Sequence, residues 1–200
     1  MKTLFVSLKG GVGKSCLATF MATYLHHIYV TNDLITPAQN DEDAIQIDTN
    51  KKRIPKHILA LDDVVFDFGA ISTYLDPKIG QLLNHVDLII VPTRTDPRSI
   101  EATIETVNLI NEFDTPIVII INNFRQMKKY ESARDELINK LGKMPIYYIK
   151  ETTLFDRMTT DGLEWYSNID HTMGEHQLQK TNQFITGVFK RVIKHAGATS

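Results

Sequence analysis

The sequence has a single cysteine, Cys16, and no apolar run long enough to cross a membrane as a helix. One cysteine cannot form a disulfide within the chain, which agrees with a reducing, cytoplasmic compartment. The net charge of −2 excludes an overall polycation, so any contact with nucleic acid must come from a local basic patch. No repeat or low-complexity tract divides the 200 residues. We therefore expect one domain over residues 1–195 and a disordered tail over 196–200.

A glycine-rich segment near the start of the chain has the context of a phosphate-binding loop. An apolar run over 3–8 predicts a strand before it, and apolar residues at helical spacing predict a helix from Ser15 to about His27. Glycine lets successive backbone N–H groups point at an anion, and the helix N-terminus adds its dipole. Lys14 would neutralise phosphate charge, and the Ser15 hydroxyl would hold Mg²⁺. The residues expected to bind the nucleotide here are Lys9, Gly10, Gly11, Val12, Gly13, Lys14, Ser15 and Cys16.

The ordinary phosphate-loop pattern fails here, because Leu8 stands where its first glycine belongs. The deviant form, Lys-Gly-Gly-x-Gly-Lys-Ser/Thr, matches at every fixed position over 9–15. On this segment the chain resembles the ParA/MinD superfamily of deviant Walker ATPases, most of all the small ParA-like partition ATPases. The resemblance implies that Lys9 is catalytic and reaches across a nucleotide-sandwich dimer to the partner's ATP. A second positive charge at the phosphates would stabilise charge that builds as the γ-phosphoryl group leaves.

An apolar, β-branched run ends in Asp67 and is followed closely by Gly69. This pattern is typical of a buried parallel strand that delivers a carboxylate to its C-terminal edge. Asp67 fits the second Walker motif, in which an aspartate holds the water shell of Mg²⁺ opposite Ser15. Gly69 would let the backbone move near the γ-phosphate.

The end of the predicted second strand, over 28–32, departs from the family pattern. Relatives carry two acids there, and Asp33 matches the first, which makes it a candidate catalytic residue. Ile35 stands where the second acid would position the attacking water. The acids at 41–43 could replace it if the loop folds back, although a solvated acidic loop is the simpler interpretation. Because of this departure, an alternative function is that of a switch protein that binds ATP but hydrolyses little of it.

The most apolar segment, over 116–123, predicts a central buried strand that ends in Asn122 and Asn123. An amide offers both a donor and an acceptor, which suits the paired edge of adenine. The alternative is that these residues only form a turn after the strand. The resemblance supports base recognition, and it implies that a loop over 152–158 packs beside the base.

The best basic patch consists of Arg125, Lys128, Lys129 and Arg134, around the start of a helix predicted over 127–141. Acidic residues are interleaved with it, so a solvated helix face is the favoured interpretation and contact with DNA phosphates the alternative. A last amphipathic helix over 177–194 either covers the sheet, as in ParA-like relatives, or binds membrane, as in MinD-like ones. We favour the first.

Strands that alternate with helices predict a doubly wound α/β fold with a mainly parallel sheet and helices on both faces. With the resemblance, this implies an ATP-dependent homodimer that hydrolyses ATP to ADP and phosphate and acts in DNA partition or positioning. It also implies Mg²⁺, non-specific DNA at the nucleoid, and a stimulating centromere-binding or adaptor protein. The alternatives are a MinD-like membrane-associated regulator and the weakly hydrolysing switch.

Overall fold

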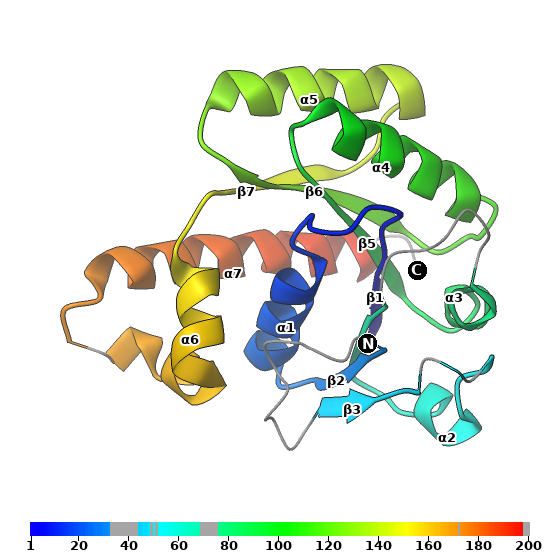
Figure 1. Cartoon of the computed structure of the whole chain (residues 1–200), viewed down its shortest axis with the longest axis horizontal. Coiled ribbons are helices and arrows are strands. Elements are labelled where there is room, and N and C mark those ends of the chain that lie inside the picture. Colours follow the sequence, from blue (N-terminus) through cyan, green and yellow to red (C-terminus); the bar gives the residue numbers. More distant parts are fainter. Residues whose placement is uncertain (33–43, 49, 51, 69–75, 172, 198–200) are drawn as a thin grey trace.

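The computed structural model describes residues 1–32, 44–48, 50, 52–68, 76–171 and 173–197. Its centre is a seven-stranded sheet in the order β3-β2-β4-β1-β5-β6-β7, and every neighbouring pair of strands is parallel (Figure 1). The strands are β1 (Lys2–Phe5), β2 (Ile28–Thr31), β3 (Ala44–Gln46), β4 (Val64–Asp67), β5 (Leu88–Thr93), β6 (Ile117–Phe124) and β7 (Ile146–Lys150). The parallel, doubly wound arrangement is therefore confirmed.

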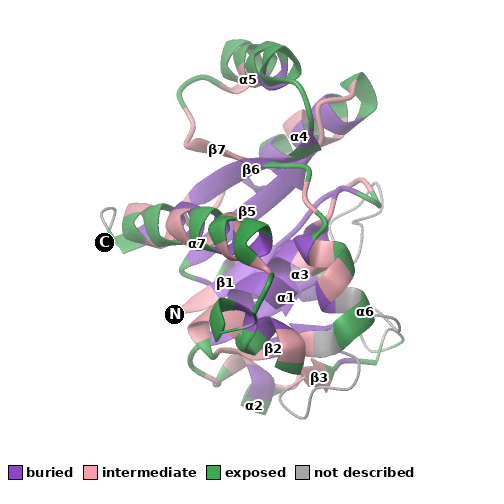
Figure 2. Cartoon of the chain, turned by 90° about the vertical axis from the view of Figure 1, so that its left-hand side faces the viewer, coloured by how far each residue is buried: buried purple, intermediate pink, exposed green. Residues whose placement is uncertain are grey.

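Helices cover both faces of this sheet (Figure 1). The first face packs against α2 (Lys56–Leu59), α3 (Pro77–Leu83), α4 (Pro97–Ile110) and α5 (Met127–Leu141). The second packs against α1 (Lys14–Leu25), α6 (Leu154–Ser167) and α7 (His176–Gly197), with a 3₁₀ turn, η1 (Ile169–His171), between the last two. Successive strand residues alternate between the faces, so Leu4 joins the first core and Phe5 the second. Figure 2 shows the buried sheet between these layers.

Two of these helices begin at an Asp-Pro pair. The side chain of Asp76 accepts a hydrogen bond from the Lys78 amide at 2.8 Å, and that of Asp96 accepts one from the Ser99 amide at 3.0 Å. Aspartate is a strong N-cap, and proline suits the first helical position because its missing N–H has no partner there. Asp96 thereby becomes part of the loop edge where the candidate site lies.

Two sequence-based predictions differ from the structure, one about a loop and one about the place of a strand in the sheet. The segment predicted as a loop over 152–158 enters a helix, α6, at Leu154, and this helix continues to Ser167. The strand predicted to be central, β6, lies next to the edge strand β7, whereas β1 is at the middle. Full burial requires only that helices cover both faces of a strand, so apolar content does not fix its place in the order.

The last helix covers the sheet, as favoured from the sequence. Ile185, Val188, Phe189 and Val192 of α7 are buried in the second core, while Phe184 beside them remains 41% exposed. The apolar stripe is therefore used for packing. Within the described residues, no helix combines the length and the apolar character needed to cross a membrane. The end of the predicted tail, 198–200, lies outside the described residues.

Candidate functional site

The glycine-rich segment joins β1 to α1 through two residues in the left-handed region. Gly11 has φ of 74°, and Gly13, the N-cap of α1, has φ of 87°. A Cβ at Gly13 would also lie 2.3 Å from Nδ2 of Asn122 at the end of β6. Gly13 is therefore required both for its backbone angle and for its lack of a side chain. This geometry places the N-terminus of α1, which favours an anion through its backbone N–H groups and dipole, directly after the glycines.

Lys14 and Asp67 meet beneath this loop. Lys14, the first residue of α1, is buried and forms an ion pair and hydrogen bond with Oδ1 of Asp67, the last residue of β4. Asp67 has 0% exposure, and its other oxygen, Oδ2, accepts a hydrogen bond from the Tyr29 hydroxyl at 2.5 Å. Burial and the Asp67 charge raise the pKa of Tyr29, so this hydroxyl stays a donor. The sequence predicted Lys14 and Asp67 but gave no signal for Tyr29.

Lys9, predicted to act across a dimer, contacts its own chain in this structure. Its Nζ donates to Oδ1 of Asp96 at 2.9 Å and to Oγ of Ser99 at 2.7 Å, at the N-terminus of α4. Burial raises the pKa of Asp96, but hydrogen bonds from Ser99 and Lys9 outweigh it and bring the pKa to about 2. The cap box Asp-Pro-x-Ser is visible in the sequence, but nothing there links it to Lys9.

A cavity of about 200 Å³ lies beside the loop. Its lining consists of Gly13, Cys16, Asn122, Asn123, Lys150, Glu151, Thr152, Phe155 and Asp156. Asn122 is only 4% exposed, and its Nδ2 donates to the Val12 carbonyl at 3.4 Å. Its Oδ1 accepts no hydrogen bond from the described residues. A buried acceptor without a donor favours a ligand that donates there, as the exocyclic amino group of adenine would.

Other predicted residues differ in their surroundings. Asn123 lines the cavity but is exposed, with φ of 57°, and it lies within β6 where the register with β7 shifts, so the strand does not end in a turn at this residue. Burial, with the charges of Asp156 and Asp67, raises the pKa of Cys16, so its thiol is not activated despite the helix N-terminus. Asp33, the candidate catalytic acid, lies outside the described residues.

The donor set fits magnesium. Ser15 is in the first turn of α1, and Asp67 supplies a carboxylate from β4. Among the residues that the structure describes, no group of three or more His, Cys, Asp or Glu side chains could hold a metal ion. Mg²⁺ commonly uses one or two protein oxygens and completes its shell with waters and substrate phosphates. A hydroxyl and one carboxylate beside a phosphate loop meet that requirement.

The basic patch carries less free charge than the sequence suggested. Arg125 pairs with Glu151, with Nη2 and Oε1 3.1 Å apart, and Arg134 pairs with Asp135 at 2.8 Å. Lys128 and Lys129 are exposed, and neither forms an ion pair within the described part of the chain. Within this patch, the charge that remains for a nucleic acid is therefore that of Lys128 and Lys129, at the first turn of α5.

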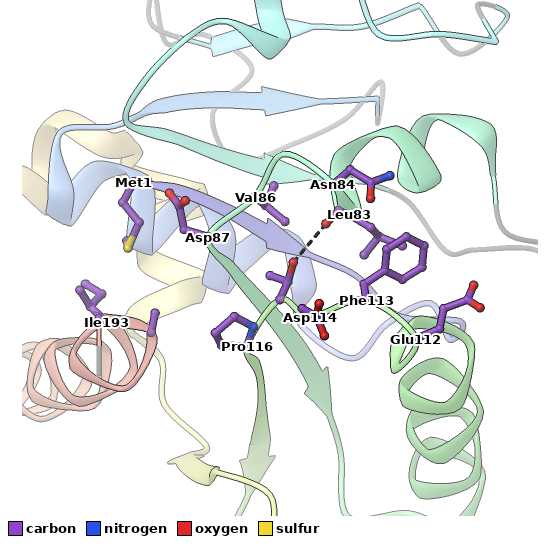
Figure 3. Close-up of a pocket in the computed structure, with 13 residues that line it drawn as sticks. Met1, Leu83, Asn84, Val86, Asp87, Glu112, Phe113, Asp114, Pro116 and Ile193 are labelled. Atoms are coloured by element: carbon purple, nitrogen blue, oxygen red, sulfur yellow. Dashed lines mark hydrogen bonds between the residues drawn. The ribbon is translucent and has the colours of Figure 1, made fainter. Parts of the chain in front are cut away.

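A larger hollow, of about 690 Å³, lies at the opposite edge of the sheet (Figure 3). Met1, Asp87 and Pro116 mark it as the edge where strands begin, because each precedes a strand. Met1 faces Ile193 of α7 across it in Figure 3. None of the predicted site residues lines this hollow. The larger of these two hollows is therefore not the candidate site, because the predicted site residues lie at the other edge of the sheet.

Neither protein-family models nor curated proteins match the sequence. Solved structures do. The chain is similar to apo McdA from Cyanothece, at 13% identity over 92% of this chain and 98% of that one, with a TM-score of 0.63. It is similar to MinD with Mg-ADP from Pyrococcus horikoshii OT3, at 15% identity over 100% and 98%, with a TM-score of 0.64. It is also similar to a ParA family ATPase from Chlorobium tepidum TLS, at 19% identity over 92% and 96%, with a TM-score of 0.61. This chain therefore has the fold of the ParA and MinD ATPases, as its deviant phosphate loop predicts.

Proposed function

We propose that this chain is an ATP-dependent dimerising ATPase of the ParA type, acting in DNA partition or positioning. The observation that carries the proposal is the buried Lys14–Asp67 pair beneath a loop with left-handed glycines. A cation, a carboxylate and a helix N-terminus at one strand edge are what a nucleoside triphosphate and its metal ion need. The similar MinD structure is itself a Mg-ADP complex.

In the proposed reaction, the loop and the first turn of α1 bind the β- and γ-phosphates through backbone N–H groups. Lys14 would leave Asp67 for the phosphates. Ser15 and Asp67 would hold Mg²⁺, which when bound would neutralise negative charge on the phosphates. The Asn122 carbonyl accepts a hydrogen bond from the base. Catalysis by these groups is positioning and electrostatics, and Asp33, the match to the family's first acid, is a further candidate catalytic residue.

Dimerisation is the proposed output of ATP binding. Lys9 would leave Asp96 and Ser99 and contact the ATP of a second copy, where its charge stabilises the transition state. A stimulating adaptor or centromere-binding protein would then accelerate hydrolysis. A membrane-binding role is disfavoured because the apolar stripe of α7 is packed in the core.

Co-sedimentation with non-specific duplex DNA and with anionic liposomes, each with ATP and with ADP, tests the proposal. We expect DNA binding with ATP only. Replacing Lys128 and Lys129 by alanine should abolish it, whereas replacing Lys140 and Lys143, further along the same chain, should not. Liposome binding with ATP would favour the MinD-like role, and ATP binding with neither surface would favour a switch that acts on a protein partner. Absence of nucleotide binding would refute the proposal as a whole.

A further inference from the structure

Tyr29 supplies a contact to the candidate magnesium ligand that the phosphate-loop pattern does not include. It lies on β2, which pairs with β4 so that Tyr29 is opposite Val65 and Thr31 is opposite Asp67. Val65 and Asp67 are two residues apart on one strand and share a face, and Tyr29 and Val65 pack in the same core as α1. The tyrosine hydroxyl therefore reaches Asp67 diagonally, on the face from which Lys14 also approaches.

Lys14 and Tyr29 donate to different oxygens of the Asp67 carboxylate. Lys14 holds Oδ1, and Tyr29 holds Oδ2 at 2.5 Å. Tyr29 is 2% exposed and Asp67 fully buried, so no bulk water is available to replace a lost donor. A buried carboxylate that loses a partner without replacement is strongly unfavourable.

We infer that Tyr29 is a positioning residue. It keeps Asp67 hydrogen-bonded and fixed in place when the Lys14 ammonium moves from Asp67 to the phosphates of a bound nucleotide. This inference rests on the proposed nucleotide site. Without the tyrosine hydroxyl, nucleotide binding would take Lys14 away from a buried carboxylate that has already lost its other donor. The hydroxyl thereby lowers the free-energy cost of the exchange, and its loss should weaken nucleotide binding rather than only the folded state.

The test compares Tyr29→Phe with Tyr166→Phe. Tyr166 is a matched control, because it is also buried in the second core and its hydroxyl donates to Asn182 Oδ1 at 3.0 Å, on α7. Each substitution removes one buried hydroxyl and keeps the ring. The affinity of each variant for a fluorescent ATP analogue with Mg²⁺ would be measured well below its unfolding temperature. We expect Tyr29→Phe to weaken binding by about tenfold and Tyr166→Phe by less than about twofold.

A second pair of variants assigns the effect to the carboxylate. In an Asp67→Asn background the buried charge is gone, so Tyr29→Phe should change the affinity by less than about twofold. An equal loss in both backgrounds would mean that Tyr29 acts only through packing. Equal affinities of Tyr29→Phe and Tyr166→Phe would overturn the inference outright. If the unmodified protein binds no nucleotide, the proposed function fails instead, which separates the two results.

Discussion

Replacing Asp96 by asparagine should strengthen ATP-dependent dimerisation. Asp96 and Ser99 hold Lys9 within its own chain, and in the proposed dimer Lys9 must leave them. Asparagine caps a helix as well as aspartate does, so α4 should be preserved while the charge attraction is lost. The Lys9 and Asp96 side chains are 33% and 46% exposed, so the pair is worth only about 0.2–1 kcal/mol after solvent screening.

A symmetric dimer breaks two such pairs, so the gain is about 0.4–2 kcal/mol, or about 2- to 30-fold in the dimer dissociation constant. Sedimentation velocity over a concentration series with a non-hydrolysable ATP analogue would measure it. Asp76→Asn is the matched control, since Asp76 caps α3 in the same way without contacting Lys9. A dissociation constant that is unchanged or higher in Asp96→Asn would refute the reasoning.

The same pair predicts how dimerisation responds to pH. The pKa of Asp96 lies at about 2, below the ordinary value of 3.8, because of the Ser99 and Lys9 donors. A depressed carboxyl pKa contributes stability that is present above the ordinary pKa and is lost as pH falls through the folded-state value. The dimer dissociation constant of Asp96→Asn, divided by that of the unmodified protein, should therefore stay constant from about pH 5 to about pH 8. A ratio that changes across this range would exclude Asp96 as the group responsible.

Two further substitutions probe the loop. Gly13→Ala should abolish nucleotide binding and lower the free energy of unfolding by about 1–2 kcal/mol, because it combines a left-handed backbone with a clash at Asn122. Gly142→Ala, which is also at positive φ but in open space and away from the loop, should keep nucleotide binding in the same fluorescence titration. Lys14→Ala should cost about 3 kcal/mol in urea unfolding, since it leaves the Asp67 charge buried without its cation. A loss below about 1 kcal/mol, the value of an exposed ion pair, would contradict it.

The sequence predicts the parts of the site that are close together along the chain. The phosphate loop needs glycine, lysine and serine at fixed spacing, and Asp67 stands at the end of a recognisable buried strand, so both could be found by pattern. Asn122 follows the same logic at the end of β6. In each case one local rule, a strand that ends in a polar residue, places the side chain at the correct edge of the sheet.

The contacts of these residues depend on register and strand order, which the sequence pattern does not contain. Tyr29 reaches Asp67 only because β2 pairs with β4 in the observed register. Lys9 reaches Asp96 across 87 residues of chain, because β1 and β5 are neighbours. Phe155 and Asp156 of the cavity lining come from the start of α6, where the sequence predicted a loop. Such contacts arise from tertiary packing, so no window of local sequence carries them.

The hollow in Figure 3 has a practical consequence for following this protein in cells. Met1 and Gly197 both line it, so the two ends of the described chain lie at the edge of the sheet away from the phosphate loop. A fluorescent protein joined by a flexible linker at either end would stand clear of the nucleotide and of Lys9.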